Sequence, residues 1–280
     1  MSKLIIHKTA QEFLDQDYSF LMENELANNL TFGVTLGLDN KNIENPDHRI
    51  ISVTNENNQT VAVSVNISPR MMISGNGNSK DSIKHISEYF SISGYPVTSI
   101  IGEKGIPEIF ADNFNKIKIS GRDLIVHQLK ETKDLKLSAG TLHLANEIDL
   151  PQLAEFRYGF DIETFGYSKS NKDKLYSETK ANIKKRNLFV WKDNYEIVSM
   201  AVLMRSTQNI SIIGKVYTPK DLRGKGYGTS IVHSLSNELL SRGLPVCALF
   251  TDKLNLSSAK IYYKVGYRPA MEFTDIYFDN

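Results

Sequence analysis

Cysteine is almost absent from the chain, and its scarcity excludes several classes of protein. Cys247 is the single cysteine among 280 residues, so neither a disulfide framework nor a cysteine-built metal cluster can form. The six histidines show no H-x-x-x-H or similar ligand spacing, which argues against metal catalysis. A single cysteine, in an apolar run, fits a protein of a reducing compartment, and the missing ligand patterns lead us to expect no metal.

Long apolar segments are also missing, as is an excess of charge of either sign. No uncharged run approaches the roughly 20 apolar residues that a membrane span needs, and the apolar stretch near the start is too short for a signal peptide. Lysine and arginine total 33 against 32 acidic residues, and a net charge of +1 provides no basic surface for nucleic acid. We expect a soluble, cytoplasmic protein without a nucleic-acid or membrane partner.

What is present is an ordinary globular composition with two similar halves. Hydrophobic residues make up 41% of the chain, enough for a sizeable core. In the C-terminal half, the patterns predict strands over 188–191, 196–204, 210–217, 245–252 and 268–278, and helices over 149–160, 171–186, 226–242 and 255–265. In the N-terminal half, they predict a helical region near 10–30, a hairpin over 49–55 and 60–68, and then helix 81–90, strand 96–101, helix 106–114 and strand 123–129.

Shifting the N-terminal half by 149 positions (224 minus 75) superimposes it on the C-terminal half. The coincident positions are Gly75 and Gly224, Gly77 and Gly226, Ile83 and Val232, Ile86 and Leu235, Phe90 and Leu239, and 94–97 and 243–246. Two unrelated units with the same turn chemistry are the alternative, but agreement without a gap favours a duplicated domain. We place the boundary within 135–145 and expect domains of residues 1–138 and 139–280.

The segment RGKGYGT (223–229) places three alternate glycines between a predicted strand and a predicted helix. The first N–H groups of a helix have no intrahelical partner, and the helix dipole adds about half a positive charge there. Glycine lets an anion approach the backbone closely, and Arg223 and Lys225 add positive charge. The pattern predicts a site for a pyrophosphate or a similar anion.

Other interpretations of these glycines fit less well. A P-loop needs G-x-x-x-x-G-K-[ST], and no such lysine follows here. A dinucleotide fold needs G-x-G-x-x-G in a βαβ unit, whereas this chain has G-x-G-x-G after antiparallel strands. A turn without a ligand is disfavoured by the flanking cations. In the first copy, Ser74, Asn76 and Ser79 replace the two cations and the third glycine, so we expect no phosphate there.

Two segments resemble the GNAT superfamily of acyl-CoA N-acyltransferases. Residues 223–228 match the [Q/R]-x-x-G-x-[G/A] signature. Asn255, Ile261-Tyr262 and Gly266-Tyr267 are similar to the family's N-x-x-A-x-x-L-Y-x-x-x-G-[F/Y] segment, with Ala259 one position after the alanine of that pattern. The resemblance covers about 148–280, and the N-terminal half resembles the degenerate first copy of tandem members. It implies an α/β (mixed α+β) fold with two tandem GNAT-like domains, each a mostly antiparallel central sheet flanked by helices.

The resemblance also implies acetyl-CoA as co-substrate. In the family, the glycine motif binds the diphosphate, the pantetheine arm pairs with the preceding strand where two central strands splay apart, and an asparagine contacts the cofactor near its thiol. The implied cofactor-binding residues are Val216, Tyr217, Thr218, Arg223, Gly224, Lys225, Gly226, Tyr227, Gly228, Thr229 and Asn255. Tyr262 stands where the family has the acid that protonates the leaving thiolate. A core tyrosine bonded to a backbone acceptor is the alternative, with Tyr263 as a control.

The predicted activity is N-acetyl transfer to a primary amine by direct attack, with a backbone N–H near 216–218 stabilising the oxyanion. The acceptor is a small molecule or peptide amine, and the protein is a monomer or at most a weak homodimer. A longer acyl-CoA, a non-amine acceptor, or a non-catalytic coenzyme A sensor are the alternatives.

No general base is assigned. The strand segment 210–219 contains no carboxylate where many relatives have a glutamate, and Lys215 is a poor base unless it is desolvated. The candidates for this base are Asp161, Glu163, Asp252, Glu272 and a water chain.

Overall fold

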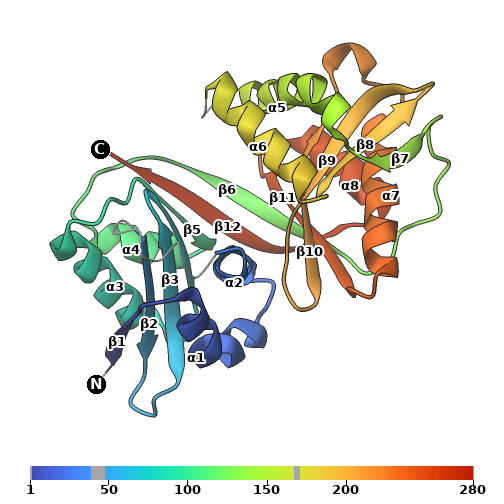
Figure 1. Ribbon diagram of the computed structural model, residues 1–280. Coiled ribbons are helices and arrows are strands. Elements are labelled where there is room, and N and C mark those ends of the chain that lie inside the picture. Colours follow the sequence, from blue (N-terminus) through green and yellow to red (C-terminus); the bar gives the residue numbers. More distant parts are fainter. Residues whose placement is uncertain (1, 39–47, 167–170, 280) are drawn as a thin grey trace. The chain divides into compact units, whose positions relative to one another are not determined.

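The computed structural model describes residues 2–38, 48–166 and 171–279, and the chain divides into two compact units (Figure 1). Unit 1 is built from the residues up to 126, from 252–254 and from the residues after 269. Unit 2 is built from 127–251 and 255–269. The sequence placed everything after 138 in the second domain, whereas two C-terminal segments belong to unit 1. The boundary at 138/139, which follows the duplication, stays a prediction.

Unit 1 is a mostly antiparallel sheet with helices on both faces. Its strands are β1 (Lys3–His7), β2 (His48–Thr54), β3 (Thr60–Ile67), β4 (Arg70–Gly75), β5 (Ser99–Glu103), most of β12 (Arg268–Phe278) and most of β6 (Lys118–Leu129), in the order β1-β2-β3-β4-β5-β12-β6. Its helices are α1 (Ala10–Glu23), α2 (Asn29–Leu36), α3 (Lys80–Ser93) and α4 (Ile106–Asn113). Of the neighbouring pairs β1–β2, β2–β3, β3–β4, β4–β5 and β5–β12, only β4–β5 is parallel.

Strand alternation puts α1 and α3 on opposite faces of this sheet. Ile51 and Val53 of β2 are fully buried in the cluster that includes the apolar side of α3. Ser52 lies between them and faces the other way, and its hydroxyl donates to the Asp17 carboxylate on α1 at 2.5 Å. The long helical region predicted near 10–30 is two helices. The Asn28 side-chain amide donates to the carbonyls of Phe20 and Leu21 at 2.9 and 3.2 Å, in place of the backbone N–H groups that would continue the first helix.

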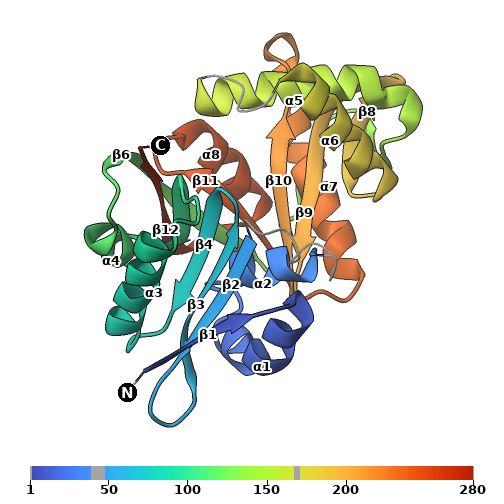
Figure 2. The same cartoon turned by 60° about the vertical axis from the view of Figure 1, so that its left-hand side comes forward.

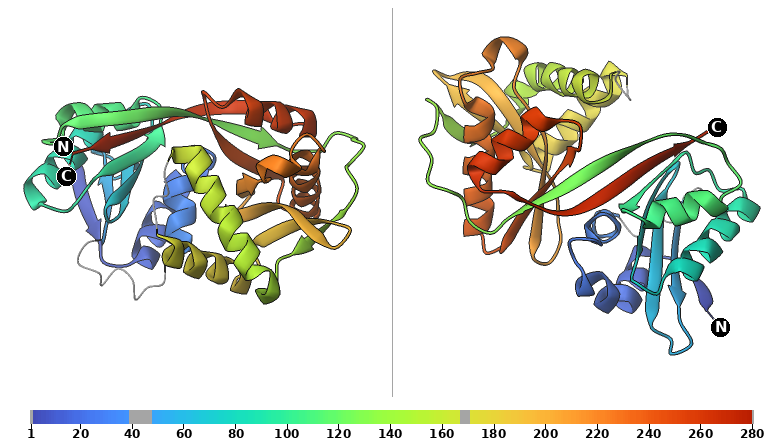
Figure 3. Two further views of the ribbon diagram at one scale, coloured as in Figure 1. Left: turned by 90° about the horizontal axis from the view of Figure 1, so that it is seen from above. Right: turned by 180° about the vertical axis from the view of Figure 1, so that it is seen from behind.

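The last strand completes the sheet of unit 1. β12 pairs antiparallel with β5, from Phe273 opposite Glu103 to Tyr277 opposite Ser99. On its other side it runs next to β6, as Figure 3 shows. Asp275 of β12 is fully buried and accepts from Arg70 at 3.1 Å and from Arg122 at 3.1 and 3.2 Å. The final strand of the chain is therefore held in unit 1 by charge as well as by backbone pairing.

Replacing Asp275 by asparagine lowers the free energy of unfolding by about 2–3 kcal/mol, because two partly buried guanidinium groups lose their shared counter-charge. Urea-induced unfolding measures the change. Asp123→Asn removes an exposed partner of Lys104 and serves as the control, with an expected change below about 0.5 kcal/mol. Equal effects of the two variants would contradict the role given to Asp275.

Unit 2 repeats the architecture. Its strands are β7 (Thr141–Leu144), β8 (Leu188–Asp193), β9 (Glu196–Ser206), β10 (Ile210–Tyr217), β11 (Val246–Asp252) and the end of β6, in the order β6-β11-β10-β9-β8-β7. Its helices are α5 (Leu150–Phe165), α6 (Lys172–Lys184), α7 (Tyr227–Ser241) and α8 (Leu256–Val265), with short 3-10 turns η2 (Glu147–Asp149) and η3 (Lys220–Leu222). The fold class predicted from the sequence is confirmed, although neither β1 nor β7 was anticipated.

Two apolar clusters cover the two faces of this sheet. Leu188 and Val190 of β8 pack with residues of α5 and α6, while Phe189 and Trp191 pack with residues of α7 and α8. Figure 2 shows β9 and β10 side by side, with α7 next to them. The central strand β10 therefore lies between α5 on one face and α7 on the other, and its end leads into the loop before α7.

Candidate active site

Strands β10 and β11 part before either of them ends. Their parallel pairing runs from Ile210 opposite Val246 to Ile213 opposite Leu249, although β10 continues to Tyr217 and β11 to Asp252. On the other side of β10, the register with β9 shifts between Gly214 and Tyr217, which marks a β-bulge. Residues 214–219 are half-buried. The strands thus part in the way that the resemblance to the GNAT superfamily implied.

The bulge and the strand end are held by specific contacts. Lys215 has a left-handed backbone with φ of 50°. Ser199 of β9, which is fully buried, donates to the Tyr217 carbonyl at 2.9 Å and contacts the Thr218 hydroxyl at 2.9 Å. The course of the backbone leading into the glycine loop is thus set by β9 rather than by β11.

The glycine loop presents its backbone amides outward. Gly224 and Gly226 have φ of 82° and 87°, a region that side chains rarely adopt. Within the part of the chain that the structure describes, no N–H of residues 224–229 donates to a protein acceptor, whereas the N–H of Ser230 bonds to the Gly226 carbonyl at 3.0 Å. A run of free donors at the start of a fifteen-residue helix has the geometry and the partial positive charge that favour an anion.

The side chains of the loop take different roles. Tyr227 is buried, and its hydroxyl donates to Asp193 at 2.5 Å, so only its backbone is available to a ligand. That hydrogen bond to the Asp193 carboxylate raises the pKa of Tyr227. Lys225 is exposed and has no ion-pair partner among the described residues. Its ammonium is the free positive charge beside the amides.

Arg223 braces the loop instead of standing free. Its guanidinium donates to the Glu163 carboxylate of α5 at 2.6 Å and to the Thr218 carbonyl at 2.9 Å. The Tyr217 hydroxyl donates to the other oxygen of Glu163 at 3.2 Å. Burial, followed by the nearby Glu163 carboxylate, raises the pKa of Tyr217. Glu163 thus ties β10 and the loop to α5, a role that no sequence pattern indicated because 60 positions separate it from Arg223.

Tyr262 of α8 is buried in the apolar core of unit 2, with 8% of its surface exposed. No described residue forms a hydrogen bond with its hydroxyl, so the backbone acceptor required by the core-tyrosine alternative is not found in residues 2–38, 48–166 and 171–279. Burial raises the pKa of Tyr262 to about 12. Tyr263 is 43% exposed and lies under the Arg268 guanidinium, with 5.4 Å to the ring centre. The two neighbouring tyrosines therefore occupy different surroundings.

Comparison with known proteins agrees with this geometry. The sequence profile described as the Acetyltransferase (GNAT) family matches residues 156–267. Residues 156–267 are therefore similar to GNAT acetyltransferases. No curated protein matches it.

Solved structures extend the likeness of fold to nearly the whole chain. A GNAT-family acetyltransferase from Colwellia psychrerythraea has 13% identity and a TM-score of 0.61, with 99% of this chain and 100% of that chain covered. A GCN5-related N-acetyltransferase from Sphaerobacter thermophilus has 13% identity and a TM-score of 0.59, covering 98% and 94%. A tandem GNAT protein from the clavulanic acid biosynthesis pathway has 9% identity and a TM-score of 0.57, covering 99% and 98%. The tandem GNAT architecture is thus confirmed at the level of fold.

Acyl transfer from an acyl-CoA is the chemistry of this family. The described residues contain no group of three or more His, Cys, Asp or Glu side chains placed to hold a metal ion. Across the same residues, no helix combines the length and apolarity needed to cross a membrane.

The loop of the first GNAT copy differs from RGKGYGT in the way its donors are used. The N–H groups of Asn76, Asn78 and Ser79 donate to the Val61 carbonyl at 3.0 Å, the Asn76 side chain at 3.1 Å and the Asn76 carbonyl at 3.0 Å. Neither glycine of this loop, Gly75 nor Gly77, has a positive φ. The first-copy loop therefore uses these donors within unit 1, and the absence of a phosphate site there stays a prediction.

The strands of the first copy also leave little room for a cofactor arm. A Cβ on Gly102 of β5 would lie 2.4 Å from the Ile73 carbonyl oxygen of β4. At the corresponding position of unit 2, Thr251 carries a side chain whose hydroxyl contacts the His127 imidazole at 3.0 Å. The backbones of β4 and β5 thus stay close where those of β10 and β11 have parted.

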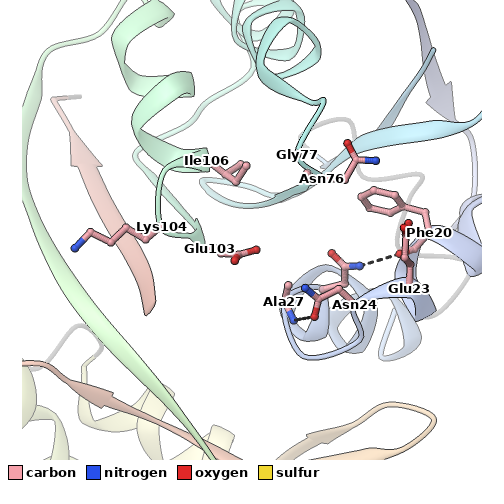
Figure 4. Close-up of a pocket in the computed structure, with 11 residues that line it drawn as sticks. Phe20, Glu23, Asn24, Ala27, Asn76, Gly77, Glu103, Lys104 and Ile106 are labelled. Carbon is pink, nitrogen blue, oxygen red and sulfur yellow. Dashed lines mark hydrogen bonds between the residues drawn. The ribbon is translucent and has the colours of Figure 1, made fainter. Parts of the chain in front are cut away.

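Unit 1 nevertheless has a cavity of about 520 Å³ beside this loop (Figure 4). It is lined by Phe20, Glu23, Asn24, Ala27, Asn28, Gly75, Asn76, Gly77, Glu103, Lys104 and Ile106. Burial raises the pKa of Glu103. The Lys104 ammonium points away from the cavity and is held by Asp123 and Glu272 at 3.0 and 2.8 Å. The charged groups that face this space are therefore acidic, unlike the cationic surroundings of residues 224–229.

The carboxylates considered as bases from the sequence are engaged elsewhere. Glu272 and Asp252 belong to unit 1, and hydrogen bonds from Lys104 and Lys253 lower the pKa of Glu272 to about 2. Asp161 pairs with Arg157 inside unit 2, and Glu163 pairs with Arg223. Glu272, Asp161 and Glu163 are thus each paired with a cation, whereas Asp252 accepts from the Leu254 N–H at 2.9 Å.

Asn255 precedes α8, where its carbonyl accepts from the Ala259 N–H at 3.4 Å, and its side chain is exposed.

The segment before β7 was not predicted from the sequence to support the site. Ser138 donates through its N–H and its hydroxyl to Ser230 in the first turn of α7, each at 2.8 Å. Nearby, Trp191 donates to the Ala139 carbonyl at 2.9 Å. These contacts hold the start of α7 in place, and a serine spacing of 92 positions gives no local signal.

Proposed function

We propose that the GNAT domain of unit 2 transfers an acetyl group from acetyl-CoA to a primary amine of a small molecule or peptide. The observation that carries this proposal is the run of free backbone donors over 224–229, next to the point where β10 and β11 part. These donors with the Lys225 ammonium suit a diphosphate. Residues Val216, Tyr217 and Thr218 offer a strand edge to the pantetheine arm, and Asn255 lies on the loop before α8.

The proposed reaction is direct attack of the neutral amine on the thioester carbonyl. The nitrogen forms a bond to the carbonyl carbon, the carbon–sulfur bond breaks, the amine loses one proton, and the sulfur gains one. A backbone N–H of the bulged stretch near 216–218 stabilises the oxyanion. Cys247 takes no part as a nucleophile, because it is fully buried and burial raises the pKa of its thiol to about 12.

Tyr262 supplies the proton to the leaving sulfur. A phenol with a pKa of about 12 is a weak acid against a thiolate in water, whose thiol has a pKa of about 8.5. Removal of water changes that comparison, since burial alone brings the Cys247 thiol of the same core to about 12. Burial likewise disfavours a thiolate formed beside Tyr262, so proton transfer from the phenol is less unfavourable there than in water.

The experiment mixes the protein with acetyl-CoA and a library of primary amines, and detects free coenzyme A with a thiol reagent. We expect thiol release that depends on one or a few amines, with the acetylated amine identified by mass spectrometry. Butyryl-CoA and succinyl-CoA, tested in parallel, measure acyl selectivity, and acetyl-CoA should react fastest. Tight binding of acetyl-CoA without turnover for any amine would instead identify a coenzyme A sensor.

A further inference from the structure

The backbone at Lys215 is strained at the point where the proposed chemistry takes place. Its φ of 50° is uncommon for a residue with a side chain, and such outliers cost about 1–3 kcal/mol. The outlier lies inside the bulge between Gly214 and Tyr217 and two positions after the last β10–β11 pair. A glycine would adopt this conformation without strain, whereas lysine adopts it at a conformational cost.

The Lys215 side chain is turned toward α5 and α6. Val216, the next residue, packs into the cluster that contains α7, whereas the charges that act on Lys215 come from α5 and α6. Arg157 and Asp161 of α5 and Glu178 of α6 are the charged groups that face it. The β9 residues opposite the bulge, 200–202, and the β11 residues 250–251 carry no charge.

Both carboxylates near Lys215 are already directed to Arg157. Arg157 is hydrogen-bonded to one oxygen of Asp161, which is 99% buried, and its other nitrogen lies 4.0 Å from Glu178. Lys215 has neither an ion-pair nor a hydrogen-bond partner among the residues that the structure describes. Burial first, and then the Arg157 charge, lowers the pKa of Lys215. An ammonium without a counter-ion in such a place gives up its proton readily.

We propose that Lys215 is the general base of the GNAT domain and removes the proton from the ammonium group of the acceptor before attack. This assignment rests on the proposed acetyl transfer. The neutral Lys215 amine accepts one proton from the acceptor, and the acceptor nitrogen, now with a free lone pair, attacks the thioester carbonyl. The Lys215 ammonium, stabilised only by the partly engaged Asp161 and Glu178, returns the proton to water after each turnover. A lysine thus takes the place that a glutamate occupies in many relatives.

The first test measures the ionisation of Lys215 itself. In protein labelled with ¹³C at the lysine ε-carbon, the Lys215 resonance is identified by its loss in Lys215→Met. We expect it to titrate below the ordinary lysine value of about 10.4. Titration at or above that value would overturn the proposal, whatever the amine library shows.

The second test uses acetyl-CoA and the alkylamine of the library that is acetylated fastest. Lys215→Met should lower kcat/KM by about 10²–10⁴-fold, leave the dissociation constant of coenzyme A within about twofold, and abolish the part of the pH profile that rises with the Lys215 ionisation. A fluorinated, weakly basic analogue of the same amine is already neutral, so its loss of rate should be much smaller. An equal loss for both amines would contradict proton removal by Lys215, as would acetylation of Lys215 itself in an intact-mass measurement.

Lys215→Gly is the matched variant for stability. It relieves the left-handed strain, so it should melt at the same temperature as the wild type or higher, while losing the same activity as Lys215→Met. Unchanged activity in a stable Lys215→Gly protein would overturn the role as a base. If no amine is acetylated by the wild type, the proposed acetyl transfer fails, and the titration of Lys215 still decides whether this lysine is poised as a base.

Discussion

Replacing Gly226 by aspartate weakens the binding of coenzyme A by about 100-fold, equivalent to about 2.7 kcal/mol. Gly226 has a φ of 87°, so any side chain here strains the loop. The introduced carboxylate also stands beside donors that are proposed to bind a diphosphate, and like charges at this distance repel by a few kcal/mol. Isothermal titration calorimetry with coenzyme A measures the effect.

The first copy provides a matched control for this variant. Gly77 occupies the corresponding position of unit 1 and has no positive φ, and a Cβ added to it would meet no atom within 4 Å. Gly77→Asp adds the same charge to the protein and should leave coenzyme A affinity unchanged. Wild-type affinity in Gly226→Asp would mean that residues 224–229 do not bind the phosphates.

Removing the hydroxyl of Tyr262 lowers kcat by about 10²–10⁴-fold, the range for loss of a general acid. The dissociation constant of coenzyme A should stay nearly constant, because the phenylalanine ring fills the same volume. Stability should not fall, since no described residue hydrogen-bonds to this hydroxyl. Steady-state kinetics with acetyl-CoA, together with a thermal melt of Tyr262→Phe, separate the chemical role from a packing role.

Tyr263→Phe is the neighbouring control. Tyr263 is 43% exposed and stacks with Arg268, so the loss of its hydroxyl should leave kcat within about twofold. If the two variants lose activity equally, or if Tyr262→Phe keeps full activity, Tyr262 is not the acid.

Local sequence patterns predicted most of the elements. The strand 210–217 and the strand 268–278 have the bounds that were predicted, and the helices after both glycine loops end at the left-handed glycines Gly94 and Gly243. Alternation and helical spacing act over a few residues, so a single pass along the chain detects them. β1 and β7 were missed because they are short edge strands whose five and four residues show too little alternation.

The site was predicted in part for the same reason. The glycines of the loop carry a local signal, since only glycine adopts φ near 85° without cost, and the structure finds that conformation at Gly224 and Gly226. The engagement of Arg223 by Glu163 has no such signal. The environment of Lys215 has no local signal either, because it depends on how Asp161 of α5 and Glu178 of α6 pair with Arg157.

The sequence by itself determined the mixed α/β class, the internal repeat and the loop that suits a diphosphate, because each depends on residues close together in the chain. Only the tertiary structure decided that β12 completes unit 1 through Asp275, that β10 and β11 part after Ile213, and that Lys215 has no counter-ion among the described residues. Asp275 and Arg70 are 205 positions apart. Contacts over such separations depend on which apolar surfaces are buried together. That burial has no local sequence pattern, so it is seen only in the folded chain.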